Sequence, residues 1–431
     1  MNPRKIVKAL IPKKLFKTVE PYGHLAEAMI FNAINGFPSR GLKVIGVTGT
    51  NGKTSTAFLI YRMLHEAGYK TGLMTTVGYG IGDDIKPQIH HMTNVSVPEL
   101  MKRLKEMKGV DWLVLETTSH ALAQHRVWGV PYSIAVMTNV THEHLDYHGT
   151  FANYRDAKRQ LFQMTNANKN GLGIGVINAE DESAGLFASD VTKPLTYGVK
   201  DGDLRAVDVK MTPSGSTYKA KIGKTQYDIK CNLPGSFNVS NSLAAVAVGY
   251  AIGLNKEQIE KGIAALPSVE GRMTTVDEGQ NFEVIVDYAH TPDSFEKLFK
   301  DMKPVVKGKL IVMFGSAGGQ RDPAKRPIQG EIAGKYADEI ILTEEDDRET
   351  DGMQILEEIA TGAVKAGKTL DKNLFMVHDR SEAIKFTLGR AGEGDTVLLL
   401  GKGHEKTIER ADGEHPWDEI GTAKEVLRKL S

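Results

Sequence analysis

The sequence predicts an α/β protein with a central domain built on a parallel sheet and a C-terminal Rossmann-like domain. Two observations carry this prediction. Short apolar segments alternate with helical segments from residue 43 onward, and this alternation breaks near residue 268 and then starts again. Such alternation is typical of parallel sheets covered by helices, so we expect two sheets, one after the other along the chain.

Length and composition fit this organisation and exclude several classes of protein. A chain of 431 residues has room for two or three domains, each with its own core. Lys plus Arg and Asp plus Glu both number 54, which argues against a nucleic-acid-binding protein that relies on bulk positive charge. The single cysteine, Cys231, excludes a disulfide framework and a cysteine-built zinc site. The same cysteine usage indicates a cytoplasmic location. No apolar run approaches about 20 residues, so we expect no transmembrane segment.

Residues 1–42 are predicted to form a short N-terminal leader. Residues 1–20 are basic, are interrupted by prolines and lack the apolar core of a signal peptide. This pattern favours a solvated segment over one that lies on a membrane surface. A helix is expected over residues 23–36, because apolar residues recur there at helical spacing and Gly36 follows.

The central domain is predicted to span residues 43–268. Its strands are expected at the short apolar segments, residues 43–47, 112–115, 133–138 and 173–177. Residues 196–233 alternate polar and apolar side chains and contain turn formers, which indicates an antiparallel insertion or edge. Two helices are expected after it, at residues 238–252 and 256–265.

The C-terminal domain is predicted to span residues 269–431. Its strands are expected at residues 282–286, 309–314, 339–343, 374–377 and 396–400. A helical stretch follows each of them, which is the pattern of a doubly wound sheet.

A glycine-rich loop stands between the first strand and the next helix. Glycines let the backbone turn tightly, so that amide groups and the helix N-terminus face phosphates. Lys53 can bridge the outer phosphates, and the Thr54 hydroxyl can bind Mg²⁺. The general pattern requires glycine where this chain has Val47, so the loop fits the narrower form Thr-Gly-Thr-Asn-Gly-Lys-Thr. The loop predicts a central P-loop ATPase domain; the alternative is a chance glycine turn before a helix. The candidate ATP-binding residues are Gly49, Thr50, Asn51, Gly52, Lys53, Thr54 and Ser55.

Acidic, histidine and lysine side chains follow the next strands. Glu116 ends an apolar strand and offers a hard oxygen ligand for Mg²⁺, although an isolated acid there is usually only a cap. His142, His144 and His148 follow another strand, but only the His144/His148 pair has a zinc-hydrolase spacing. Lys158 lies on the helix after them, where composition alone favours a surface lysine.

The loop Thr48–Thr54 resembles the ATP loop of the Mur ligases and folylpolyglutamate synthetases, which form amide bonds through acyl phosphates. The runs Ser-His-Ala-Leu-Ala-Gln-His-Arg at residues 119–126 and Lys-Gly-His-Glu at residues 402–405 favour the cell-wall branch. The chain is therefore identified as similar to the Mur ligases that add the third residue of the peptidoglycan stem peptide. The resemblance covers about residues 37–431.

The resemblance implies an ATP-dependent, ADP-forming ligase that uses ATP and Mg²⁺ as cofactors. Its substrates would be a muramoyl-peptide-like carboxylate as acceptor and an amino acid. By matching motifs, the catalytic residues would be Lys53, Glu116, His144 and Lys158. The magnesium ligands would be Thr54, Glu116, His144 and a carbamate on Lys158, whose amine becomes nucleophilic when partial desolvation lowers its pKa.

The same resemblance supplies the substrate-binding residues. The nucleotide would meet Asn238, Arg272 and Asp287, with domain closure excluding water; as an alternative, Asn238 is only a helix cap. The acceptor would meet Thr75, Thr76, Thr93, Ser119, Gln124 and Arg126. The amino acid would meet Arg321, Arg348 and Glu405, of which Arg321 and Glu405 can pair with its carboxylate and ammonium groups.

The acidic run at residues 344–351 has two interpretations. Its six acids either form a solvated loop or attract a second amino group, which would favour lysine, ornithine or diaminopimelate. Diaminopimelate-adding enzymes show Asp-Asn-Pro-Arg here, and this chain keeps only the arginine.

About 42 residues precede the first strand, too few for the N-terminal domain that holds the UDP group in similar tripeptide synthetases. This leaves three alternatives. The enzyme binds the acceptor without contacts to UDP, a partner protein helps to bind it, or the acceptor is a different molecule. Two rival functions stay open: a ligase that adds glutamate to folate or builds a poly-amino acid, and a non-catalytic nucleotide-binding partner subunit.

Overall fold

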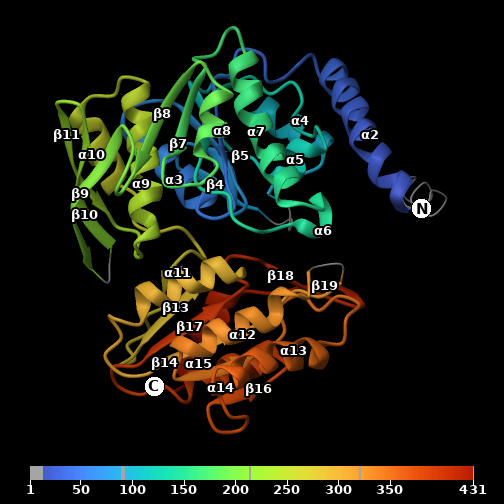
Figure 1. Ribbon diagram of the computed structural model, residues 1–431, viewed down its shortest axis with the longest axis vertical. Helices are drawn as coiled ribbons and strands as arrows, with labels where there is room; N and C mark the ends of the chain where they lie inside the picture. Colours follow the sequence, from blue (N-terminus) through green and yellow to red (C-terminus); the bar gives the residue numbers. More distant parts are fainter. Residues whose placement is uncertain (1–12, 89–92, 213–214, 320–321, 431) are drawn as a thin grey trace.

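The structure is a computed structural model that describes residues 13–88, 93–212, 215–319 and 322–430. Figure 1 shows two α/β domains, one above the other, with the N-terminal helix at the side of the upper domain. This confirms the predicted α/β class. The predicted boundary at residue 268 falls between the last helix of the first domain, which ends at Ala264, and the first strand of the second, which begins at Thr274.

The first domain is built on an 11-stranded sheet in the order β11-β10-β9-β8-β7-β6-β1-β5-β2-β3-β4. Its middle is parallel, from β9 to β2, and antiparallel pairs follow on both sides, beginning with β9/β10 and β2/β3. The strands are β1 (Val44–Thr48), β2 (Thr71–Met74), β3 (Gly78–Ile81), β4 (Asp84–Pro87), β5 (Trp112–Glu116), β6 (Tyr132–Met137), β7 (Ile174–Asn178), β8 (Lys193–Gly198), β9 (Leu204–Thr212), β10 (Gly215–Ile222) and β11 (Thr225–Cys231). The antiparallel segment expected over residues 196–233 is thus present as β9 to β11.

Helices cover both faces of this sheet, which explains why β1, β5 and β6 are buried along their whole length. One face packs against α3 (Lys53–Glu66), α9 (Phe237–Ala251) and α10 (Lys256–Ala264). The other face packs against α4 (Val97–Glu106), α5 (Ser119–Ala123), α7 (Phe151–Ala167) and α8 (Ala184–Ser189), and the short α6 (Leu145–His148) precedes α7.

The N-terminal helix α2 (Lys13–Ile34) begins about ten residues before the predicted start and continues through Pro21. Pro21 lies in the interior of this helix and has no backbone N–H, so the helix lacks one i→i−4 hydrogen bond there. The helix packs against α4 through buried Ala28 and neighbouring Phe31. No helix in the described ranges is long and apolar enough to cross a membrane.

The second domain is built on a six-stranded sheet in the order β12-β13-β17-β14-β15-β16, parallel except for β12. Its strands are β12 (Thr274–Thr275), β13 (Glu283–Asp287), β14 (Leu310–Phe314), β15 (Glu339–Leu342), β16 (Leu374–Met376) and β17 (Thr396–Leu400). One face packs against α11 (Pro292–Met302), α12 (Lys325–Tyr336) and α13 (Gly352–Lys365), and the other against α14 (Arg380–Leu388) and α15 (Glu419–Leu430). This is the predicted doubly wound arrangement, with a hairpin added, β18 (Thr407–Arg410) and β19 (Gly413–Pro416).

Candidate active site

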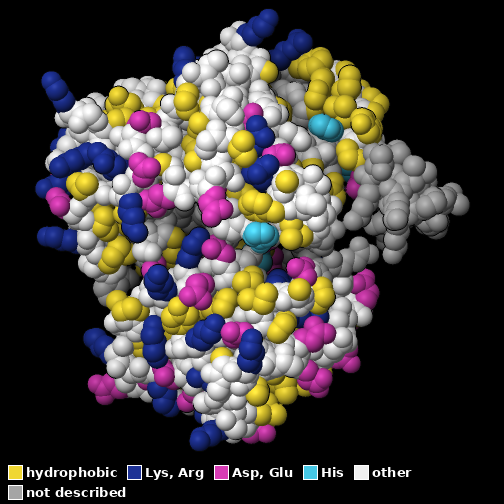
Figure 2. Space-filling view, in the orientation of Figure 1, with side chains coloured by type: hydrophobic (Ala, Val, Ile, Leu, Met, Phe, Trp, Pro, Cys, Tyr) yellow, Lys and Arg dark blue, Asp and Glu magenta, His cyan; other side chains and the backbone are white. Residues whose placement is uncertain are grey.

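A cavity of about 1580 Å³ lies between the two domains. Its lining comes from loops that follow β1, β5 and β6 of the first sheet and β13, β15 and β17 of the second. Both sheets therefore present the carboxyl ends of their strands to one space, where ligands of α/β sheets bind. Figure 2 shows acidic, basic and histidine side chains mixed along the junction of the domains.

The glycine-rich loop forms one wall of this cavity. Gly52 has φ +81°, and a Cβ atom there would lie 2.3 Å from Asn241 Oδ1, so glycine is required at this position. The Lys53 ammonium donates to the carbonyl oxygens of Gly49 (3.1 Å) and Thr50 (2.7 Å). Burial lowers the pKa of Lys53, and the carboxylates of Glu116 and Glu143 oppose that shift. The lysine is thus held at the loop by polar contacts that a phosphate can replace.

Glu116 lies directly beside the loop and is 1% exposed. Its Oε2 accepts hydrogen bonds from the Thr54 hydroxyl (3.0 Å) and from the Thr76 backbone N–H (3.1 Å). A buried carboxylate and a hydroxyl at this distance offer two hard oxygen atoms, which suit Mg²⁺.

Lys158 reaches the same loop from α7. It is 1% exposed, its ammonium donates to the Gly49 carbonyl oxygen (2.6 Å), and it lies 4.5 Å from the centre of the Tyr154 ring. The surface position favoured by composition is therefore wrong. Burial, with a further contribution from the Lys53 charge, lowers the pKa of Lys158 well below its usual value, so the amine is poised to be neutral and nucleophilic.

His144 follows β6 and has a left-handed backbone, with φ +55°. Its Nε2 lies 3.7 Å from Glu143 Oε2, and its ring packs edge-on against His120 at 4.7 Å. The structure thus brings Lys53, Glu116 and Lys158 together at one loop. His144 packs against the ring of Tyr154, whose hydroxyl bonds to Thr50 of that loop. His148 packs against the same His120 ring at 5.3 Å and bonds to the Ser119 hydroxyl at 3.1 Å.

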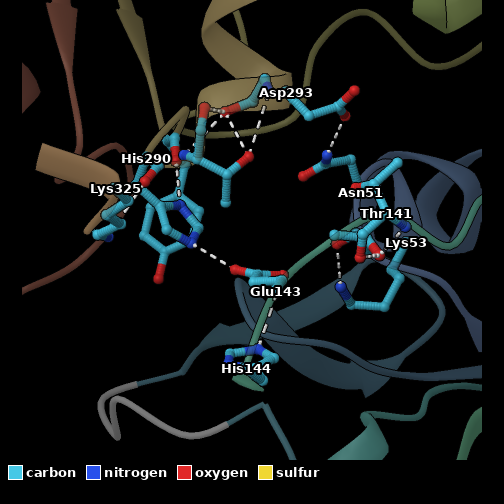
Figure 3. A network of polar contacts seen from close by, with 12 residues as sticks. Asn51, Lys53, Thr141, Glu143, His144, His290, Asp293 and Lys325 are labelled. Carbon is cyan, nitrogen blue, oxygen red and sulfur yellow. Dashed lines mark hydrogen bonds and ion pairs between the residues drawn. The ribbon is translucent and has the colours of Figure 1, made fainter. Parts of the chain in front are cut away.

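Polar contacts join the two domains across the cavity (Figure 3). Asn51 of the loop donates to Asp293 of α11 (2.7 Å), and His290 Nε2 lies 3.4 Å from Glu143 Oε1. Burial acts to raise the pKa of Glu143, but His144 and His290 outweigh it and the pKa stays well below its usual value, so the carboxylate is charged. Sequence reasoning missed Glu143 and Asp293 and left His290 without a role; the signal was the position of Glu143 directly before His144.

Three residues expected at the nucleotide line the cavity. Arg272 donates to the Thr54 hydroxyl at 3.2 Å. Asp287 accepts backbone N–H groups from Met273 and Ala289 at 2.8 Å, and burial raises its pKa. Asn238 is not a helix cap: Ser236 holds that position at the start of α9, and the Asn238 amide bonds to the Pro234 carbonyl oxygen at 2.6 Å.

The residues expected at the acceptor divide into two groups. Four line the cavity, namely Thr76, Thr93, Gln124 and Arg126. Thr75 and Ser119 do not, because both are 1% exposed and their hydroxyls are used elsewhere. Thr75 closes a turn through the Gly78 carbonyl oxygen (3.0 Å), and Ser119 bonds to His148.

The acidic run is largely buried, so the solvated-loop interpretation is wrong for residues 344–347, which are at most 6% exposed. Lys402, fully buried, donates to Asp346 (2.9 Å) and pairs with Glu405 (2.5 Å). Arg348 pairs with Glu409 at 2.5 Å. Arg321 lies outside the described residues.

His404 lies between Lys402 and Glu405 on the loop that follows β17. Its burial can be tested by the pH dependence of stability. Burial, with a smaller effect of the Arg272 charge, lowers its pKa to about 3. Since the unfolded histidine titrates near about 6.5, the unfolded chain binds a proton that the folded chain excludes, and stability falls as the pH drops between these values. When the pH is lowered from 7.5 to 5, we expect the free energy of unfolding to fall by about 2 kcal/mol less in His404→Gln than in the wild type. Urea unfolding measures this, with His415→Gln, at a half-buried histidine of the β18–β19 hairpin, as control; equal losses in both variants would contradict the buried, neutral His404.

A phosphate-binding loop, a buried carboxylate beside it and a second Rossmann-like domain that closes over both define a class of two-domain ATP-dependent ligases. The Mur ligase middle domain matches residues 47–249, and the Mur ligase glutamate ligase domain matches residues 271–403. The chain belongs to the Mur ligase family.

Relatives of known name agree with this. The chain is 41% identical to UDP-N-acetylmuramyl-tripeptide synthetase of Roseiflexus sp. (strain RS-1), over 95% of this chain and 83% of the relative. It is 40% identical to UDP-N-acetylmuramoyl-L-alanyl-D-glutamate–2,6-diaminopimelate ligase of Geobacillus thermodenitrificans (strain NG80-2), over 95% and 84%. As a family member, it is an ATP-dependent, ADP-forming ligase that makes a peptide bond in peptidoglycan synthesis.

Solved structures show the same fold. A UDP-N-acetylmuramoyl-L-alanyl-D-glutamate–2,6-diaminopimelate ligase superposes with TM-score 0.62 at 30% identity, covering 96% of this chain and 83% of that one. Folylpolyglutamate synthase of Mycobacterium tuberculosis, complexed with ADP, superposes with TM-score 0.71 at 16% identity, covering 94% of both chains.

Proposed function

We propose that this enzyme joins an amino acid with a second amino group to the carboxylate of a muramoyl-dipeptide acceptor, through an acyl phosphate. The observation that carries the proposal is the convergence of Lys53, Glu116 and Lys158 on one phosphate loop, opposite an acidic pocket in the second domain. The reaction would take place in the cytoplasm, where ATP is available.

The phosphoryl transfer needs charge neutralisation and exclusion of water rather than a protein nucleophile. A carboxylate oxygen of the acceptor attacks the γ-phosphorus of ATP and ADP leaves, with Lys53 and Arg272 supplying positive charge beside the phosphates. The amine of the amino acid then attacks the acyl carbon, loses a proton and releases phosphate. The interdomain contacts of Asn51 and His290 keep the cavity closed during these steps.

The donor set beside the loop fits Mg²⁺. Thr54, Glu116, His144 and a carbamate on Lys158 would hold it, and bound Mg²⁺ supplies positive charge for the transferred phosphoryl group. The carbamate forms when the neutral Lys158 amine attacks the carbon of CO₂ and loses a proton. The lowered pKa of Lys158 supports this step, because burial favours the neutral amine over the ammonium form.

The charge of the second pocket supports a diamino acid. The carboxylates of Glu345, Asp346 and Glu405 line the cavity, where Lys402 pairs with Asp346 and Glu405, and Arg348 pairs with Glu409 beside them. Within the described ranges, Glu345 Oε2 accepts no hydrogen bond although its side chain is 94% buried and lines the cavity. An incoming ammonium group would satisfy this oxygen and balance the excess of negative charge.

ADP release with a panel of substrates tests the proposal. UDP-N-acetylmuramoyl-dipeptide with L-lysine, L-ornithine or meso-diaminopimelate should give turnover, and omission of either the acceptor or the amino acid should abolish it. Equal activity with and without the muramoyl compound contradicts the cell-wall acceptor. Turnover with glutamate and a folate would instead favour the folylpolyglutamate-type rival, and ATP binding without turnover on any pair would favour the non-catalytic subunit.

A further inference from the structure

Tyr288, the residue after β13, lies at the centre of contacts from several parts of the site. The Arg272 guanidinium lies 4.5 Å from the centre of its ring, and the rings of His290 and His404 lie at 4.6 and 5.1 Å. Its hydroxyl donates to Glu405 Oε1 at 3.1 Å. One side chain therefore contacts Arg272, which bonds to the phosphate loop, His290, which takes part in the interdomain contact, and Glu405 of the acidic pocket.

The contacts continue on both sides of Tyr288. On the nucleotide side, Arg272 donates to the Thr54 hydroxyl of the phosphate loop. On the other side, Glu405 pairs with Lys402, which also donates to Asp346. A continuous chain of polar and cation–π contacts thus runs from the phosphate loop to the amino-acid pocket, and Tyr288 is its middle member.

Backbone packing holds the residues of this contact series close together. Gly271, next to Arg272, lies against the loop that carries Glu405, so that a Cβ atom on it would lie 2.1 Å from the His404 nitrogen. Gly403 has φ +50°, and a Cβ there would lie 2.8 Å from Tyr288 Cβ. The segments that carry Arg272, Tyr288 and Glu405 are therefore in direct backbone contact.

We propose that Tyr288 is a positioning residue that couples nucleotide binding to amino-acid binding. This rests on the proposed function of the two pockets. ATP in the first pocket fixes Arg272, Arg272 fixes the Tyr288 ring, and the Tyr288 hydroxyl fixes Glu405 for the incoming ammonium group. The coupling is reciprocal, so the amino acid tightens nucleotide binding by the same factor.

Two substitutions separate the two contacts of this side chain. Tyr288→Phe removes the hydrogen bond to Glu405 and keeps the ring under Arg272, whereas Tyr288→Leu removes both. Tyr336→Phe is the matched control, because Tyr336 donates a similar bond to Glu296 on the surface of the same domain. Calorimetry would measure binding of L-lysine and meso-diaminopimelate with and without the non-hydrolysable ATP analogue AMP-PNP and Mg²⁺, and steady-state ADP release would give KM and kcat.

For the wild type we expect AMP-PNP to tighten amino-acid binding by about fivefold or more. Tyr288→Phe should weaken amino-acid binding and raise its KM about tenfold, leave AMP-PNP affinity unchanged, and lose the coupling. Tyr288→Leu should in addition weaken AMP-PNP binding about threefold to tenfold. Tyr336→Phe should match the wild type in every measurement.

Wild-type coupling in Tyr288→Phe, or unchanged AMP-PNP affinity in Tyr288→Leu, would overturn the inference. Failure of the proposed function looks different. If the wild type binds neither amino acid, the assignment of the acidic pocket fails and the coupling fails with it. The nucleotide affinity of Tyr288→Leu then still decides whether Tyr288 positions Arg272.

Discussion

Replacing Lys158 by alanine is expected to lower turnover by about 10³-fold while AMP-PNP still binds. The reason is that the buried Lys158 amine lies at the phosphate loop, bonded to the Gly49 carbonyl oxygen, and becomes an anion there only as a carbamate. Without this group, one of the proposed magnesium ligands is missing during phosphoryl transfer. Exposed Lys169, just after α7, gives the control substitution Lys169→Ala.

Two further measurements separate a carbamate from a merely structural lysine. Wild-type enzyme freed of CO₂ should lose activity and regain it with bicarbonate, whereas Lys158→Met should not respond. Because the folded-state pKa of Lys158 lies below the unfolded value, protonation favours unfolding at neutral pH. Lys158→Met should therefore unfold at the same or a higher temperature than the wild type. Full turnover in either Lys158 variant, or no effect of CO₂ removal, contradicts the carbamate.

Glu116→Gln should lower turnover by about 10²-fold to 10³-fold and raise the Mg²⁺ concentration needed for half-maximal rate. The substitution keeps the volume of the side chain but removes the charge that faces the Thr54 hydroxyl and the Thr76 N–H. A neutral amide is a weaker ligand for Mg²⁺, whereas its carbonyl oxygen can still accept the two hydrogen bonds.

A Mg²⁺ titration of the ADP-release rate measures this effect. The control is Glu283→Gln, since Glu283 accepts a comparable bond from the Thr396 hydroxyl (3.3 Å) but does not line the cavity. If Glu116→Gln has the same Mg²⁺ dependence as the wild type and lower turnover only, then Glu116 holds the Thr76 loop in place and is not a metal ligand.

The sequence predicts those elements whose burial is visible as a continuous run of apolar residues. β1, β5 and β6 are continuous apolar runs, and the glycines before Lys53 specify the loop that follows β1. The hairpin of β3 and β4 was missed, because β4 is mostly exposed and has no apolar alternation. The residues of β4 carry no local sequence pattern that predicts its antiparallel pairing with β3.

Site residues that belong to a sequence motif could be predicted. Contacts between segments that are far apart in the sequence could not. Lys53 and Glu116 stand at strand ends and are visible in the sequence. By contrast, burial of Asp346 depends on Lys402, 56 residues away, and the charge of Glu143 depends on His290 of the other domain. The contact of Tyr288 with Glu405 spans 117 residues, so the coupling that we propose could be recognised only in three dimensions.

The most direct test of the account follows the oxygen atom of the acceptor. If the acceptor carboxylate takes the γ-phosphoryl group of ATP, turnover with an acceptor labelled by ¹⁸O in that carboxylate must place one ¹⁸O atom in each phosphate released. Mass spectrometry of the phosphate measures this directly. Released phosphate that carries no label would contradict the acyl phosphate.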